Sequence, residues 1–91
     1  MHLVEFTLTK PPEAPEPSSD ELIAALRAVC RPDDGVEHVR VHPSRAGARG
    51  AVFLLAPDAA SAVRQCRAVF RRALSVSEAL RGWRLAHPVA G

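Results

Sequence analysis

Hydrophobic and polar residues alternate in several segments of the chain, and this period of two predicts β-strands. Residues 3–9 carry Val4, Phe6 and Leu8 on one side and polar residues between them, which is typical of a half-buried strand. Residues 51–56 are apolar on both sides, which favours a strand at the centre of a sheet. With two further segments, the predicted strands cover residues 3–9, 36–42, 51–56 and 83–87.

Apolar residues at helical spacing predict two helices. The first helix spans about residues 19–31 and follows Ser18, whose hydroxyl forms a capping box with Glu21 three residues later. The second helix follows Asp58, which we expect as its N-cap residue. Residues 75–81 are ambiguous and fit a short extra turn of helix. The apolar stripe of the second helix comprises Ala62, Val63, Cys66, Val69, Phe70, Ala73 and Leu74.

The connections between these elements differ in composition. Residues 11–17 contain four prolines, which exclude helix and strand pairing and predict a stiff connector. A Pro-rich ligand for an SH3-like domain is the alternative, which the bacterial-looking composition disfavours. Residues 43–50 contain two glycines and two arginines, and they predict a mobile, basic hairpin loop.

The predicted elements follow the order strand, helix, strand, strand, helix, strand. This order resembles the ferredoxin-like βαββαβ pattern, so we predict a single α+β domain over residues 1–91. The expected sheet has four antiparallel strands in the order 4-1-3-2, with both helices on one face. We place the first and third strands as parallel neighbours at its centre. The resemblance is to a fold pattern, and the residues indicate no particular family.

The third strand determines what covers the sheet face that the helices leave bare. Its two alternating sets, Val52-Leu54-Ala56 and Ala51-Phe53-Leu55, are both apolar, and the helices can cover only one of them. An exposed apolar patch is typical of an interface, so we predict a homodimer formed through this face about a two-fold axis. The alternative is that residues 88–91 or the Pro-rich segment cover the patch. The side chains expected on this face are Glu5, Thr7, His38, Arg40, His42, Ala51, Phe53, Leu55 and Arg84.

Composition narrows the classes of protein. Of the 91 residues, 47% are hydrophobic, which is too many for a disordered chain. No apolar run approaches the roughly 18 residues of a membrane span. The first residues lack the features of a signal peptide, so we expect a cytoplasmic protein without membrane association. The two cysteines, Cys30 and Cys66, lie on apolar stripes and lack C-x-x-C spacing, so we interpret them as inert buried thiols.

Charge is distributed unevenly along the chain. Residues 1–37 carry three basic and eight acidic side chains, a balance of −5, whereas residues 38–91 carry nine arginines and two acids, a balance of +7. Arg64, Arg67 and Arg71 are expected on one solvent face of the second helix, where they form a candidate polyanion site. The chain has eleven arginines, one lysine and sixteen alanines, a bias that GC-rich codons produce. We therefore favour a solvated face.

Nucleic acid is not expected as a partner. Residues 49–56 match the third-strand motif of RNA-recognition modules at Arg49, Gly50 and Phe53, but alanine stands at both flanking positions where that motif has aromatic residues. Without a stacking platform, sequence-specific binding of RNA loses its main source of free energy.

The histidines give no metal site. His38 and His42 are about 13 Å apart along an extended strand, too far to bind one ion. His2 and His87 would approach each other if the fourth strand runs beside the first, but no third ligand accompanies them. We assign no cofactor, metal or catalytic residue.

The favoured hypothesis is a small, non-catalytic binding or accessory module that self-associates through its bare sheet face. Its candidate partners are a second copy, a small apolar ligand or another protein. One alternative is a small dimeric enzyme acting on a hydrophobic metabolite, with His38, His42 and Arg84 in acid–base or anion-positioning roles. The other is a polyanion-binding protein that uses the arginines of the second helix.

Overall fold

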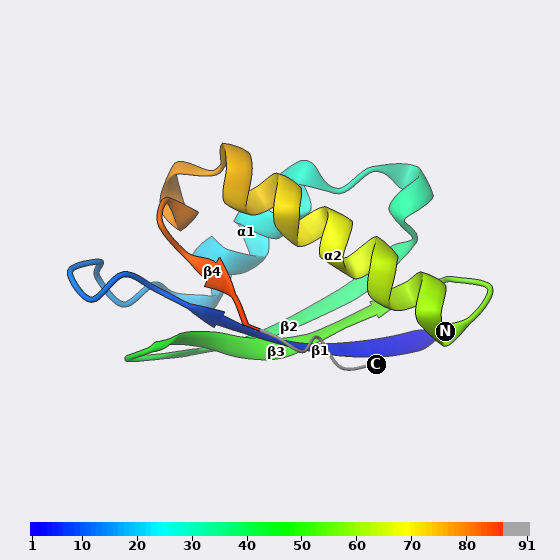
Figure 1. Cartoon of the computed structure of the whole chain (residues 1–91), viewed down its shortest axis with the longest axis horizontal. Coiled ribbons are helices and arrows are strands. Elements are labelled where there is room, and N and C mark those ends of the chain that lie inside the picture. The colour runs from blue at the N-terminus through cyan, green and yellow to red at the C-terminus, as the bar shows by residue number, and fades with distance from the viewer. Residues whose placement is uncertain (87–91) are drawn as a thin grey trace.

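The computed structural model describes residues 1–86, and these form two layers, with a sheet below and helices above (Figure 1). The helices are α1 (Ser19–Val29) and α2 (Ala59–Val76), accompanied by the single-turn 3₁₀ segments η1 (Pro32–Asp34) and η2 (Glu78–Leu80). The strands are β1 (His2–Thr9), β2 (Val36–Ser44), β3 (Gly47–Leu54) and β4 (Arg84–Leu85). Within residues 1–86, neither helix has the length and apolar character that crossing a membrane requires.

The sheet has the strand order β2-β3-β1-β4, which confirms the predicted order. All three pairings are antiparallel, so the expectation of parallel first and third strands was wrong. The physical reason lies in the connections. The crossover through α1 joins β1 to β2, which run in the same direction on either side of β3. The hairpin then reverses the chain, so β3 is antiparallel to both of its neighbours.

The segment predicted as a mobile loop over residues 43–50 is mostly strand. Ser44 pairs with Gly47, and only two residues connect β2 to β3. The period of two continues through this segment, but its inward positions carry Ala48 and Gly50, which are too small to give a clear hydrophobic signal. The prediction failed because small residues conceal the alternation.

The ends of the remaining elements differ by a few residues from the expected ones. Helix α1 stops at Val29 because Arg31, which precedes a proline, adopts an extended backbone conformation. Helix α2 continues to Val76 and is followed by η2, which resolves the ambiguity over residues 75–81. Strand β4 comprises Arg84–Leu85 alone, and His87 lies outside the described residues.

Both predicted N-caps are present. The Ser18 hydroxyl accepts a hydrogen bond from the Glu21 N–H at 3.1 Å, and the Asp58 carboxylate accepts one from the Ser61 N–H at 2.7 Å. Each bond satisfies one of the free N–H groups at the start of a helix. These caps fix where the helices begin over the sheet.

The core lies between the two layers. Strand β1 contributes Val4, Phe6 and Leu8, and α2 contributes its apolar stripe. The rings of Phe6 and Phe70 pack with their centroids 4.6 Å apart. On β3, Val52 and Leu54 are buried among these side chains. The helices therefore cover the Val52-Leu54 set, and the set containing Ala51 and Phe53 faces away from them.

A buried polar cluster joins the end of β3 to α2. The Asp34 carboxylate accepts the Arg31 N–H at 2.6 Å and forms an ion pair with Arg72. The Gln65 side chain donates to the carbonyl oxygens of Asp34 at 2.7 Å and of Leu55 at 3.1 Å. The Asp34 carboxylate and the Gln65 amide thus have partners, as burial of polar groups requires, whereas the Nε atom of Arg72 is buried without a hydrogen-bond partner in the described part of the chain. The cluster fixes the position of Leu55.

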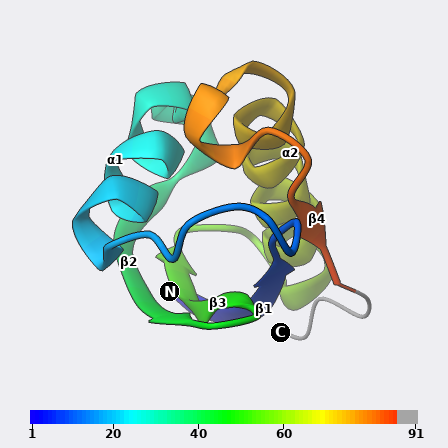
Figure 2. The ribbon, with the colours of Figure 1, turned by 90° about the vertical axis from the view of Figure 1, so that its left-hand side faces the viewer.

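The Pro-rich segment lies at one end of the molecule. The Lys10 N–H donates to the Ala46 carbonyl at 2.9 Å, and the Pro11 ring lies beside Gly82. Figure 2 shows the segment crossing the end of the structure between the sheet and the helices. The alternative in which this segment covers the bare face is therefore wrong, and residues 88–91, the other candidate cover, lie outside the described residues.

Candidate binding site on the open sheet face

Three cross-strand rows of side chains point away from the helices. Their positions follow from the register, because partners on neighbouring antiparallel strands point to the same side of the sheet. We call the surface made by these nine residues the open face. From β1 through β3 to β2, the rows are Leu3–Phe53–His38, Glu5–Ala51–Arg40 and Thr7–Arg49–His42.

One end of the open face is apolar. Leu3 is 43% exposed and Leu55, just beyond β3, is 52% exposed. Phe53 lies in the same region and is half-buried, because its ring is 5.8 Å from the ring of His38 and 5.8 Å from the guanidinium carbon of Arg40. A cation over an aromatic ring contributes about 0.5–1 kcal/mol at an exposed site. The two polar residues of β2 thus shield part of the predicted apolar patch.

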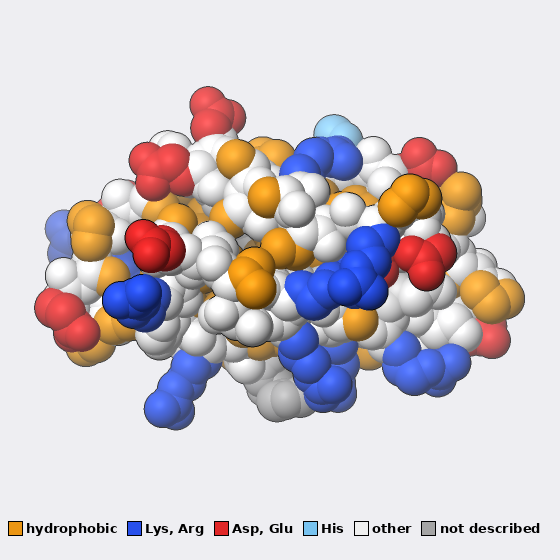
Figure 3. Space-filling view, turned by 90° about the horizontal axis from the view of Figure 1, so that it is seen from above, with side chains coloured by type: hydrophobic (Ala, Val, Ile, Leu, Met, Phe, Trp, Pro, Cys, Tyr) orange, Lys and Arg blue, Asp and Glu red, His pale blue; other side chains and the backbone are white. Residues whose placement is uncertain are grey.

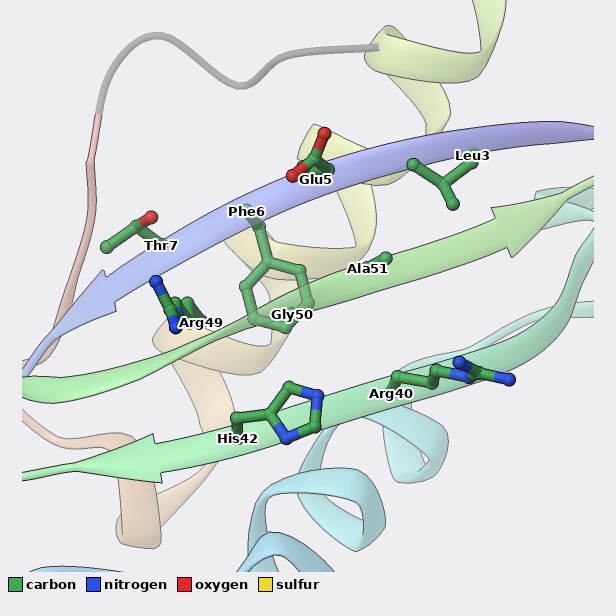
Figure 4. A pocket seen from close by; sticks show the side chains of 9 residues that line it. All are labelled: Leu3, Glu5, Phe6, Thr7, Arg40, His42, Arg49, Gly50 and Ala51. Carbon is green, nitrogen blue, oxygen red and sulfur yellow. The ribbon is translucent and has the colours of Figure 1, made fainter.

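The middle of the open face is hollowed into a concavity of about 580 Å³ (Figure 4). Its floor is low because Ala51, the outward-pointing residue at the centre of the middle row, has only a methyl group, and the backbone of Gly50 lies beside it. The absence of a side chain at Gly50 is required: a Cβ there would lie 1.9 Å from the Arg40 carbonyl oxygen and 3.1 Å from the Phe6 ring. The concavity is lined by Leu3, Glu5, Phe6, Thr7, Arg40, His42, Arg49, Gly50 and Ala51.

Charge in the concavity is predominantly positive. Its positive charges are Arg40 on β2 and Arg49 on β3, His42 on β2 adds an imidazole, and Glu5 on β1 is the single acid among the lining residues. The ion pairs found among residues 1–86 involve Asp34 and Glu78, so neither arginine of the concavity is neutralised by a neighbouring carboxylate within the described chain. Figure 4 shows Arg40 extended along β2 and His42 beside the hollow. The concavity therefore offers cationic groups to an anion.

The structure distributes the sequence-predicted residues over three parts of the sheet. Five of them surround the concavity, three lie at its margin, and Arg84 pairs with Thr9 at the far end of the sheet. Leu3, Phe6, Arg49 and Gly50 also line the concavity and were missed. Arg49 and Gly50 were assigned to a loop, although Arg49 stands in the same alternation as Ala51 and Phe53. The residues around the concavity are Glu5, Thr7, Arg40, His42 and Ala51, and those at its margin are His38, Phe53 and Leu55.

The arginines of α2 lie on the opposite side of the molecule. Arg64 and Arg71 are exposed, and Arg67 is half-buried, so the three are not equally available to a polyanion. The Arg64 guanidinium donates to the Ser61 hydroxyl at 2.9 Å. Figure 3 shows basic side chains across the middle and one long edge of this helix side, with acidic side chains toward both ends. The polyanion site stays a prediction.

The described thiols and histidines show no arrangement for nucleophilic or metal chemistry. Cys66 is fully buried, and this burial raises the pKa of its thiol to about 12. Burial, with a smaller contribution from Asp34, also raises the pKa of Cys30. Both thiols are therefore protonated and weakly nucleophilic at neutral pH. Within residues 1–86, no three His, Cys, Asp or Glu side chains are placed to hold a metal ion.

Comparison of the chain with models of known families, with curated proteins and with solved structures gives no match. The class is therefore defined by the structure alone. It is an α+β domain whose antiparallel sheet carries two helices on one face and a hollowed, mixed apolar and basic surface on the other.

Proposed function

We propose that this chain is a ferredoxin-like, non-catalytic binding module that forms a homodimer by packing two open faces together. The observation that carries the proposal is the apolar end of that face, where Leu3 is exposed and Phe53 is half-buried, with the exposed Leu55 just beyond β3. Large apolar side chains gathered on one surface mark an interface in soluble proteins, because their hydration is unfavourable.

The size of the open face supports a stable dimer. A strand of eight residues is about 27 Å long, and the three strands of the open face are together roughly 15 Å wide. The projected area is on the order of 400 Å², and the relief of the side chains increases it toward the ~800 Å² per partner of a standard interface. A second copy is the partner that matches this area without any other component.

The charges of the open face complement those of a second copy. If the two-fold axis runs along β3, β1 of one copy faces β2 of the other, with the sheets in the aligned packing common among sandwiches. Glu5 then lies opposite Arg40 of the second copy, and symmetry repeats this pair. The strand order places Glu5 and Arg40 in one row on either side of Ala51, which this pairing requires.

The oligomeric state tests the proposal. Light scattering coupled to size exclusion is expected to give twice the 9.8 kDa of the chain at high micromolar concentration. Phe53→Asp buries an unpaired charge at the interface and is expected to give a folded monomer. Arg71→Asp, an exposed change on the helix side, is the matched control and leaves the dimer intact. A monomeric parent protein overturns the proposal.

Charge reversal tests the pairing itself. Glu5→Arg and Arg40→Glu each place like charges opposite one another twice, and each is expected to raise the dimer dissociation constant at least about tenfold. The double substitution restores opposite charges and is expected to recover most of the affinity. A double variant that is as weak as the two single variants contradicts the aligned arrangement, even if the protein is dimeric.

A further inference from the structure

We infer that the concavity of the open face binds a small organic anion with an apolar body, held between the two copies of the dimer. The inference rests on the proposed dimer and adds a ligand class to it. The volume of the concavity, about 580 Å³, lies within the ~300–1,000 Å³ typical of small-molecule sites.

The acidic head of the ligand fits the polar end of the concavity. Thr7, Arg49 and His42 form one cross-strand row there and line the hollow. A guanidinium donates two parallel hydrogen bonds to a carboxylate, and a hydroxyl and an imidazole add further donors. Arg49 has no ion-pair partner among the described residues, so binding an anion does not require breaking an existing pair.

The body of the ligand fits the other end of the same hollow. The floor there consists of the Ala51 methyl group, the backbone of Gly50 and the Phe6 ring that approaches it, and Leu3 forms the wall. Figure 4 shows Leu3 and Ala51 on the side of the concavity away from Arg49. A planar apolar group lies flat on such a floor. Glu5 stands on the β1 side and disfavours a second acidic group.

The arrangement of the proposed dimer favours an anion at the polar end of the concavity, beside Arg49. When β3 of one copy packs along β3 of the other, Glu5 lies opposite Arg40, but Arg49 approaches Arg49 of the second copy. Two guanidinium groups withdrawn from water repel each other, and an anion between them converts this repulsion into attraction. The concavity on each copy supplies the space for it.

Three small probes separate the contribution of the acidic head from that of the apolar body. Isothermal titration with 2-naphthoate measures the complete ligand class, 2-naphthol supplies the same body without the charge, and acetate supplies the head without the body. We expect 2-naphthoate to bind at least about tenfold more tightly than 2-naphthol, which lacks the carboxylate for charge-assisted hydrogen bonds, and at least about tenfold more tightly than acetate, which has no apolar body to bury. Equal affinity for 2-naphthoate and 2-naphthol overturns the assignment of an anionic head.

A substitution locates the site. Arg49→Gln is exposed and removes the charge, and it is expected to weaken 2-naphthoate binding at least about tenfold. Arg71→Gln on the far side is the control and leaves binding unchanged. The amide NMR spectra of both variants show whether they are folded. Amide shifts during a titration of the parent protein with 2-naphthoate, confined to the three rows of the open face, locate the contact. Unchanged affinity of Arg49→Gln overturns the inference.

The oligomeric state, measured in the same samples, distinguishes the inference from the proposal on which it rests. A dimer that binds none of the three probes overturns the ligand site and leaves the dimer standing. A monomer that binds 2-naphthoate at the open face overturns the dimer and the bridging role of the anion. A dimer that dissociates less in the presence of 2-naphthoate, but not of 2-naphthol, supports both.

Discussion

The two faces of the sheet are built from adjacent residues of the same strands, and their chemistry is opposite. On β1, Val4 and Phe6 are buried against the helices, whereas Leu3, Glu5 and Thr7 are exposed on the other side. The covered face is constrained by packing, since every side chain must fill space without a void. The open face is constrained by the chemistry that it presents. A substitution should therefore affect folding on one side and association on the other.

The largest expected effect is on the covered face. Phe70 is 0% exposed and packs on Phe6, so Phe70→Ala is expected to lower the free energy of unfolding by about 3–5 kcal/mol. Phe53→Ala removes the same number of atoms from the open face and should lower the free energy of unfolding by much less. Chemical denaturation followed by Trp83 fluorescence measures both. Equal losses for the two variants would contradict the contrast between the faces.

The next effect concerns Gly50, where the two faces meet. A Cβ at this position would collide with the Arg40 carbonyl oxygen and press on Phe6, so Gly50→Ala is expected to cost about 1–3 kcal/mol of unfolding free energy. Ala51→Gly, one residue along on the open side, is the matched control and should cost no more than about 1 kcal/mol. Urea denaturation measures the free energy of unfolding of both variants. If Gly50→Ala leaves this free energy unchanged, Gly50 does not lie as close to the Arg40 carbonyl and the Phe6 ring as the structure shows.

The smallest effect concerns the N-cap of α2, one of the two helices that cover the sheet. The Ser61 N–H holds the pKa of Asp58 below its ordinary 3.8, so the ionised carboxylate stabilises the folded protein above that pH. This stabilisation is lost as the pH falls through the lowered pKa of the folded state. The difference in melting temperature between the parent protein and Asp58→Ala should therefore be largest at neutral pH and shrink in acid.

Ser18→Ala supplies the control for that measurement. It removes the cap of α1, a hydroxyl that does not titrate in this range, so its effect should stay nearly constant with pH. If the two variants show the same pH dependence, the carboxylate of Asp58 is not the group responsible.

Much of the fold could be predicted from the sequence because the relevant signals are local. The alternation of Val4, Phe6 and Leu8 indicated a strand, and the residues Ser18 and Asp58 indicated where the helices begin. The strand order followed from the sequence of elements. The candidate site was harder to predict. Arg49 was assigned to a loop because its neighbours Ala48 and Gly50 are too small to reveal the period of the strand.

The sequence by itself determined which residues alternate and where the helices start, since side-chain period and N-capping depend on neighbours along the chain. Only the tertiary structure decided which side of β3 the helices cover, and so that Ala51 and Phe53 face outward. It also placed Arg40 over Phe53 and opened the concavity beside Gly50. These features depend on contacts between strands that are distant in sequence, and such contacts leave no periodic signal in any one segment.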